Sequence, residues 1–220
     1  MQETAHYATA ESLIEKDHRR SVWGETWGKR RDEILGIVRG TDSESLRRDL
    51  EAALQAEEHY FQDAYTHFSQ HHDGEERFQR WMDGVVWILR QPNFVRWFIE
   101  GVLLGPRTVA QYSALLAERE GHFLFRVSTS SVRLITACVV VGGCLRRYSI
   151  VEADMVPNGQ RSFTASQCIA VYVNLFRPEF THIVLRSGSA VEKAKFFPST
   201  GYASAQQDDY FWIRSTRDYI

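Results

Sequence analysis

The spacing of apolar residues in this 220-residue chain switches after Gly121, and that switch constrains the fold most. Before it, apolar side chains recur every three to four residues, as Phe78, Met82 and Val85 illustrate. After it, they recur at every second residue. The first spacing is typical of amphipathic helices and the second of strands. The chain is therefore predicted to be an α+β protein in which helices precede the sheet.

Several helices are expected before the strands begin. They cover residues 45–58, a further stretch to about residue 70, residues 75–90, a short segment around residues 94–98, and residues 107–119. Pro92 ends the helix of residues 75–90, because proline cannot donate the amide hydrogen bond of a helix interior. Tryptophans are expected to fill the core and the contacts between modules; they are Trp23, Trp27, Trp81, Trp87, Trp97 and Trp212.

Three consecutive antiparallel strands are expected after Gly121, over residues 123–128, 134–141 and 144–151. The second and third strands are joined through a Gly-Gly pair, which is a typical hairpin turn. A second helix is expected over residues 166–175. The predicted order of this part is helix, three-stranded meander and helix.

The charge of the chain limits its partners. The formal net charge is −2, so a bulk electrostatic partner such as duplex DNA is not expected. Residues 1–105 carry a net charge of −6 and residues 106–220 a net charge of +4. An anionic ligand therefore suits the second half better than the first.

Cysteine spacing and motif searches point away from metal and enzyme chemistry. Cys138, Cys144 and Cys168 form no C-x-x-C pair, and we expect reduced core thiols. No nucleotide-binding P-loop, nucleophile-elbow, zinc-protease or kinase signature occurs, so no catalysis, cofactor or metal is expected. No signal-peptide pattern and no membrane-length apolar run are present. The expected location is the cytoplasm, with the nucleus as an alternative, and no membrane partner is expected.

Four motifs together resemble one kind of protein. Residues 123–128 (Phe-Leu-Phe-Arg-Val-Ser) resemble the Phe-Leu-x-Arg-x-Ser strand of Src-homology-2 (SH2) domains. Residues 147–150 (Arg-Tyr-Ser-Ile) resemble the family's His-Tyr-x-Ile strand, with arginine in place of histidine. Residues 78–85 and 97–105, with their Trp-Met-Asp-Gly-Val and Gly-x-x-Leu-Gly patterns, resemble the helical linker before the SH2 domain of STAT transcription factors. The resemblance covers residues 75–200.

The resemblance implies a helical linker-like domain over residues 1–104, an SH2 domain over residues 105–200 and a tail over residues 201–220. An SH2 domain has a central antiparallel sheet flanked by two helices. The STAT type has an extra C-terminal helix in place of the late small strands, and residues 189–195 are the candidate. The ubiquitin ligase Cbl also places helical modules before an SH2 domain, but its linker pattern fits less well.

Arg126 is the candidate phosphate ligand of such a domain. Its strand position places it on the same face as Leu124 and Ser128, beneath the first helix of the SH2 domain. Phosphotyrosine carries a charge of about −1.5 to −2, and a guanidinium can donate two parallel hydrogen bonds to two phosphate oxygens. The resemblance implies that Ser128, Thr129 and Ser130 form the phosphate-binding loop.

Two further cations are candidates. The resemblance implies a second cation at the start of the first SH2 helix, which is Arg107, or the neighbouring Thr108 if the alignment shifts by one residue. Arg147 stands where the family often has histidine beneath the phosphotyrosine ring, and arginine can stack on that ring. The alternatives are an ordinary solvated residue of the first helical turn for Arg107 and a solvent-facing strand residue for Arg147.

The leading prediction is a phosphotyrosine-binding module that recognises tyrosine-phosphorylated proteins or peptides without catalysis. Tyr210 and Tyr219 are candidate phosphorylation sites, since STAT proteins dimerise through a phosphorylated tail that binds the partner's SH2 domain. A homodimer of this kind is one expected assembly, and the alternative is that the aromatic residues around Tyr210 pack on the domain. The alternative function is a scaffold that has an SH2 shape and binds partners independently of phosphotyrosine.

Overall fold

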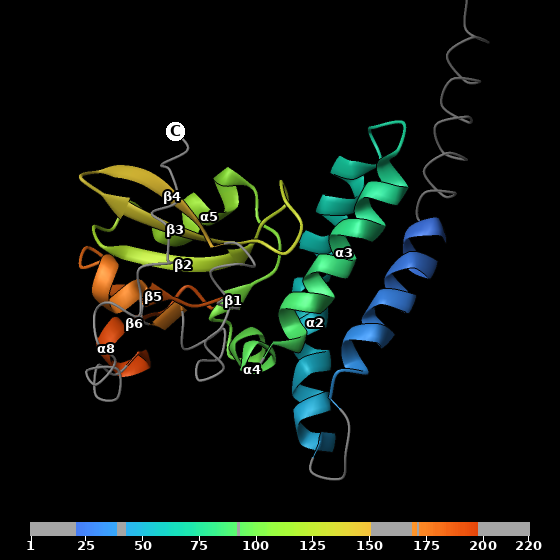
Figure 1. Ribbon diagram of the computed structural model, residues 1–220, viewed down its shortest axis with the longest axis horizontal. Coiled ribbons are helices and arrows are strands. Elements are labelled where there is room, and N and C mark those ends of the chain that lie inside the picture. Colours follow the sequence, from blue (N-terminus) through green and yellow to red (C-terminus); the bar gives the residue numbers. More distant parts are fainter. Residues whose placement is uncertain (1–20, 39–42, 92, 151–168, 171, 198–220) are drawn as a thin grey trace, which may run out of the picture.

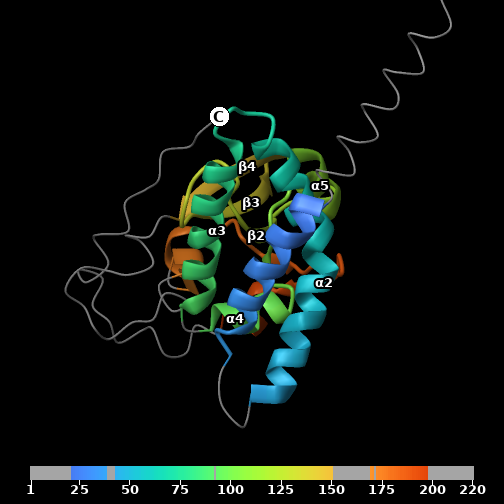
Figure 2. The ribbon, with the colours of Figure 1, turned by 90° about the vertical axis from the view of Figure 1, so that its right-hand side faces the viewer.

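The computed structural model describes residues 21–38, 43–91, 93–150, 169–170 and 172–197. It combines several helices with a six-stranded sheet, which confirms the α+β prediction. Figure 1 shows long helices on one side of the molecule and the sheet on the other, and in Figure 2 the helical side faces the viewer with the sheet behind it.

Within the described residues, three long helices make up the helical part. The first covers residues 21–35, α2 is Ser43–Phe68 and α3 is Gly74–Arg90. The short helix α4, Phe94–Ile99, leads from α3 to the sheet. The predicted helix of residues 75–90 is thus confirmed to within one residue, and the two helical stretches expected up to about residue 70 are one continuous helix.

The sheet contains β1 (Leu103–Leu104), β2 (His122–Val127), β3 (Ile135–Val141), β4 (Cys144–Ile150), β5 (His182–Val184) and β6 (Ala190–Glu192). Its order is β4-β3-β2-β5-β6, and β1 runs parallel to β2. The predicted meander is confirmed, because β2 pairs antiparallel with β3 and β3 pairs antiparallel with β4. Because β1 ends at Leu104 and already pairs with β2, the sheet begins just before the predicted domain boundary.

The region after β4 differs from its prediction. Residues 189–195 were expected to form a helix, but Ala190–Glu192 form β6, and only the short helix α8, Lys193–Phe196, follows. The helical prediction is therefore wrong for β6, whose pairing with β5 provides backbone hydrogen bonds that a helix would have supplied locally. The predicted helix of residues 166–175 lies partly outside the described residues; residues 169–170 are helical and Tyr172–Phe176 form a π-helical turn.

The helix before β2 is α5, Val109–Leu116, and it is shorter than the predicted residues 107–119. Its first turn is a capping box, in which Gln111 N donates to Thr108 Oγ1 at 3.4 Å and Thr108 N donates to Gln111 Oε1 at 2.8 Å. The helix ends where Ala117 adopts a left-handed φ of 48°. Arg107 consequently lies before the helix and not in its first turn.

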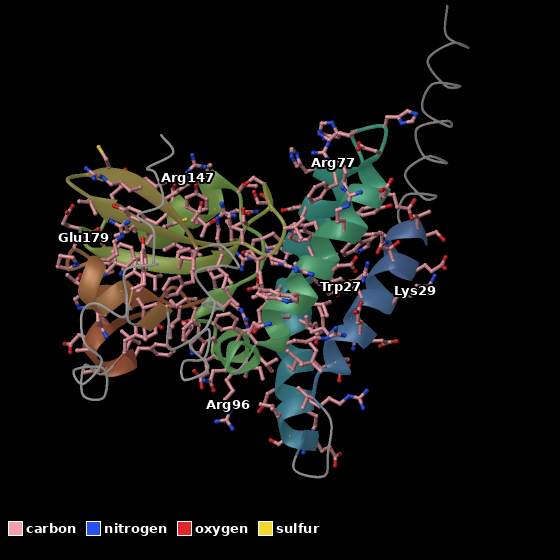
Figure 3. All side chains as sticks on the ribbon, in the orientation of Figure 1. Trp27, Lys29, Arg77, Arg96, Arg147 and Glu179 are labelled. Carbon is pink, nitrogen blue, oxygen red and sulfur yellow. The ribbon has the colours of Figure 1, made fainter. Side chains whose placement is uncertain are left out.

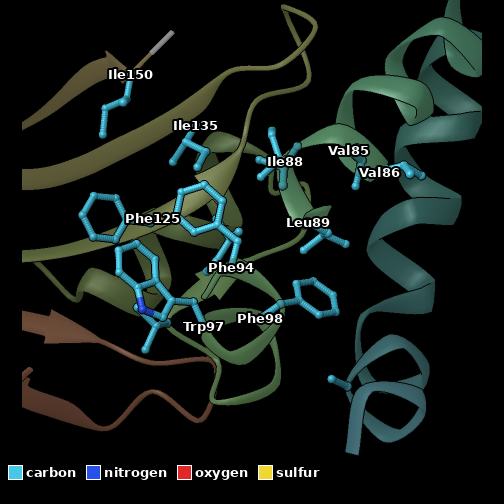
Figure 4. Packing of buried hydrophobic residues seen from close by; sticks show 14 of the residues in the cluster. Val85, Val86, Ile88, Leu89, Phe94, Trp97, Phe98, Phe125, Ile135 and Ile150 are labelled. Atoms are coloured by element: carbon cyan, nitrogen blue, oxygen red, sulfur yellow. The ribbon is translucent and has the colours of Figure 1, made fainter. Parts of the chain in front are cut away.

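The two faces of the sheet bury different partners. Phe123, Phe125 and Val127 of β2 belong to a core that continues into the helical part, and Trp97 stacks on Phe125 with ring centroids 6.1 Å apart. Figure 4 shows this contact between α4 and the sheet. The opposite face carries Leu124, which packs with the buried residues of α5. The sheet thus has one face toward the helical part and one face toward α5.

Burial confirms most of the predicted core. Four of the six tryptophans are buried and Trp87 is partly buried, while Trp212 lies outside the described residues. Cys138 is buried as expected, but Cys144 is exposed, so its assignment to the core is wrong. Cys144 begins β4 directly after the Gly-Gly turn, where the strand has no neighbour on its outer side among the described strands. Cys168 lies outside the described residues.

Candidate functional site

Arg126 lies in β2, between β1 and β3. Its Cα is paired with Leu104 on one side and with Thr136 on the other. Strand alternation places its side chain on the α5 face, as predicted, and its guanidinium carbon lies 5.0 Å from the ring centroid of Tyr112 in α5. The residue is only 6% exposed. Arg126 is therefore a charged side chain held inside the protein by the strand and the helix.

The guanidinium of Arg126 has few partners for a group so buried. Its Nη1 donates to the carbonyl oxygen of Val127 at 3.2 Å, and its Nε has no hydrogen-bond partner. None of the ion pairs found between described residues includes Arg126. A buried charge without a counter-ion is costly, so this side chain is suited to receive an anion.

The register of the sheet brings further groups to the same face. Thr136 of β3 pairs with both Arg126 and Ser149, which places two hydroxyl side chains in the row of the arginine. Two pairs further along, and so on the same face, Cys138 is paired with Arg147 of β4. The structure thus brings Arg126 and Arg147 to one face of the sheet, with Thr136 and Ser149 beside them.

Burial raises the pKa values of two groups near Arg126, the Tyr112 hydroxyl and the Cys138 thiol. Desolvation raises the pKa of the Tyr112 hydroxyl, and the Cys138 thiol raises it further, against the lowering influence of Arg126 and Arg147. Desolvation likewise raises the pKa of the Cys138 thiol, and the two arginines oppose this shift. Both groups are therefore neutral at neutral pH and do not supply a counter-ion to Arg126.

The predicted phosphate-binding loop begins where β2 ends. Ser128 is 1% exposed, and its Oγ lies 3.0 Å from the Oγ of Ser130 and accepts a 3.3 Å hydrogen bond from the Ser130 amide. Thr129 lines a cavity of about 190 Å³ that also borders Tyr60 of α2 and Thr108. Ser128 and Ser130 thus form a small hydroxyl cluster two residues beyond Arg126, and Thr129 faces a cavity bordered by α2 and the start of α5.

The structure places Arg107 in a different environment. Its guanidinium is paired with Glu57 of α2, with Nη1–Oε2 and Nη2–Oε1 distances of 2.6 and 2.7 Å. Arg186 Nε donates to the same carboxylate at 2.7 Å, and the Gly105 amide donates to it at 3.0 Å. Tyr60 covers Arg107, with 3.1 Å between its ring centroid and the guanidinium carbon. We call the set Glu57, Arg107 and Arg186 the junction cluster, because it joins α2 to the segment before α5 and to the turn between β5 and β6.

Arg147 is exposed on β4 and forms no ion pair with a described residue. Its influence on the Tyr112 pKa shows that its charge lies near that hydroxyl. Figure 3 labels Arg147 at the sheet end of the molecule, away from Lys29 and Arg77 on the helices. The candidate tail tyrosines, Tyr210 and Tyr219, lie outside the described residues.

Sequence reasoning missed several groups around Arg126 and Arg107. The Gly-Gly turn predicts that Thr136 faces Ser149, because a two-residue turn fixes which residues of a hairpin face each other. Their place beside Arg126 depends on the register of β2 with β3, which that turn does not set. Tyr112 was identified as an apolar-face residue of its helix, although its position over Arg126 was not foreseen. Glu57 had no distinguishing signal, because it is one of many acidic residues in the first half of the chain.

None of the family models compared with the chain matches it, and neither a curated protein nor a solved structure does. Within the described ranges, no three His, Cys, Asp or Glu side chains are grouped so that they could hold a metal ion. No helix in the described part of the chain has the length and apolar character needed to cross a membrane.

Proposed function

We propose that this chain is a phosphotyrosine-binding module of the STAT type, in which a helical linker packs on an SH2 domain. The observation that carries the proposal is the guanidinium of Arg126, which is buried beneath Tyr112 and has no carboxylate partner among the described residues. The resemblance of residues 123–128 to the SH2 strand motif is the reason for proposing phosphotyrosine as the anion.

The chemistry of the face fits a phosphate monoester. A dianionic phosphate compensates the buried charge of Arg126 and accepts parallel hydrogen bonds from its guanidinium, which are about twice as strong as neutral ones. The hydroxyls of Ser128, Ser130 and Thr136 are neutral donors on or next to the same face. Arg147, exposed and on the same face, is the cation placed to contact the phosphotyrosine ring or phosphate.

The proposal assigns the second cation differently from the sequence prediction. Arg107 is bonded to Glu57 through both of its terminal nitrogens, so its guanidinium fork is already occupied. We therefore assign phosphate binding to Arg126 and, in support, to Arg147. Reciprocal dimerisation through phosphorylated Tyr210 or Tyr219 would use the same face.

The decisive experiment is a calorimetric titration with a degenerate phosphotyrosine peptide library and its unphosphorylated counterpart. Arg126→Ala should weaken binding of the phosphorylated library by about a hundredfold or more, because charged hydrogen bonds to phosphate have no replacement. Arg146→Ala is the matched control, since Arg146 is exposed on the same strand but paired with Val139 on the opposite face. Undiminished binding by Arg126→Ala would contradict the proposal.

A second candidate function is a scaffold that binds partners without phosphotyrosine. One observation favours it: Val109, the first residue of α5, is 55% exposed, so the start of this helix offers an apolar contact and no free cation. This alternative predicts equal binding of the phosphorylated and unphosphorylated libraries and a loss of binding in Val109→Asp.

A further inference from the structure

The loop that follows β2 is fixed by the helical part of the molecule. Trp81 of α3 donates a 2.6 Å hydrogen bond from Nε1 to the carbonyl oxygen of Ser128, and both residues are at most 2% exposed. The Ser128 amide donates to the Leu134 carbonyl at 2.9 Å. Both backbone polar groups of Ser128 therefore have partners, one from the far end of its own loop and one from α3.

Two neighbours of Trp81 on α3 extend this contact. At Gly84, a Cβ would lie 2.7 Å from Val132 Cγ1 and 2.8 Å from the Arg133 amide nitrogen, so only glycine admits the loop this close. The guanidinium carbon of Arg133 lies 5.2 Å from the Trp87 ring centroid. Three positions spaced three residues apart on α3 thus provide a hydrogen-bond donor, a gap and an aromatic surface for one loop.

We propose that Trp81 is a positioning residue for phosphate binding, which makes α3 part of the phosphotyrosine site. This inference rests on the proposed function. The hydrogen bond from Trp81 holds Ser128, and Ser128 in turn holds the hydroxyl and amide of Ser130. A loop that is already ordered loses less conformational entropy when it binds an anion, so its affinity is higher.

Trp81→Phe tests this, because phenylalanine keeps an aromatic ring and lacks the N–H donor. We expect its affinity for phenyl phosphate, followed by NMR titration of the full chain, to fall about five- to tenfold. Hydrogen exchange of the amides of residues 129–133 should become faster in the same variant. Trp27→Phe is the matched control: Trp27 is equally buried, and its Nε1 has no hydrogen-bond partner to lose.

Gly84→Ala tests the same contact between α3 and the loop with the same two measurements. Alanine favours helix more than glycine does, so α3 is not weakened, while the new methyl group must displace the loop. We expect weaker phenyl phosphate binding and faster exchange of the loop amides in this variant as well.

The outcomes separate the two proposals. Wild-type affinity for phenyl phosphate in both Trp81→Phe and Gly84→Ala overturns the positioning role and leaves the proposed function intact. An equal loss of affinity in Trp27→Phe also overturns it, because a general effect of core packing would then explain the result. Failure of the wild-type protein itself to bind phenyl phosphate overturns the proposed function and, with it, this inference.

Discussion

Arg107 and Arg126 are buried to the same degree, at 4% and 6% exposure, yet their surroundings are opposite. Arg107 belongs to the junction cluster, where it makes two close contacts with Glu57. Arg126 donates to the backbone carbonyl of Val127, and none of the ion pairs between described residues includes it. The difference lies in the internal counter-ion, which Arg107 has and Arg126 lacks among the described residues. This difference, and not burial, is the ground on which we propose Arg126 and not Arg107 as the anion-binding residue.

The largest expected effect comes from removing the carboxylate of the junction cluster. Glu57→Gln leaves Arg107 and Arg186 without their shared counter-ion, and breaking a buried ion pair costs about 3–5 kcal/mol of folding free energy. Urea unfolding of the full chain measures the loss. Glu58→Gln is the control, because Glu58 is half-buried and forms no ion pair with a described residue. A loss below about 1 kcal/mol would remove the contrast between the two arginines.

A smaller effect of opposite sign is expected at Arg126. Arg126→Met keeps an unbranched chain and removes an uncompensated charge, so stability should stay equal or rise by about 1–2 kcal/mol. Phenyl phosphate should stabilise the wild-type protein against urea and leave the variant unchanged, because a ligand stabilises only the state that binds it. A marked loss of stability in Arg126→Met would reveal an internal partner and weaken the case for an external anion.

The smallest expected effect is a loss of folding stability at alkaline pH, caused by Cys138 on the sheet face that carries Arg126. Burial raises the pKa of the Cys138 thiol above its ordinary value of 9.0, so the unfolded chain releases this proton first. Stability should therefore be complete below pH 9 and decrease above it, by at most about 1.4 kcal/mol per pH unit. Urea unfolding from about pH 8 to about pH 10 tests this. Cys138→Ala should reduce the slope, and Cys144→Ala, at an exposed thiol, should retain it.

The contrast between the two arginines also explains which of their surroundings could be predicted from the sequence. The face of β2 that carries Arg126 follows from strand alternation. The Gly-Gly turn determines the pairing of β3 with β4, including Thr136 with Ser149, so both features depend on neighbours close in sequence. The position of Arg107 depends on Glu57, which lies 50 residues earlier in a helix with several other acidic residues. Glu57 is the partner of Arg107 because α2 packs against the sheet part. The local spacing of residues around either side chain does not predict this pairing.

The helix predicted over residues 189–195 was wrong for a related reason. The run Ala190–Glu192 and the following Lys193–Phe196 are too short for hydrophobic periodicity to separate strand from helix. Pairing with β5, which itself pairs with β2, determines the conformation. Elements defined by long-range pairing were therefore missed, while the meander and the long helix α3 were predicted correctly.

The junction cluster has a consequence for how the chain is made. Glu57 and Arg186 are 129 residues apart in sequence, yet they share a hydrogen bond of 2.7 Å. During synthesis from the N-terminus, the helix that carries Glu57 is finished long before either of its arginine partners exists. Burying its carboxylate before Arg107 and Arg186 are made would leave a charge without a counter-ion, so we expect the final docking of α2 to follow the synthesis of both arginines. The last turn of the sheet thereby completes the packing of a helix that was made near the beginning.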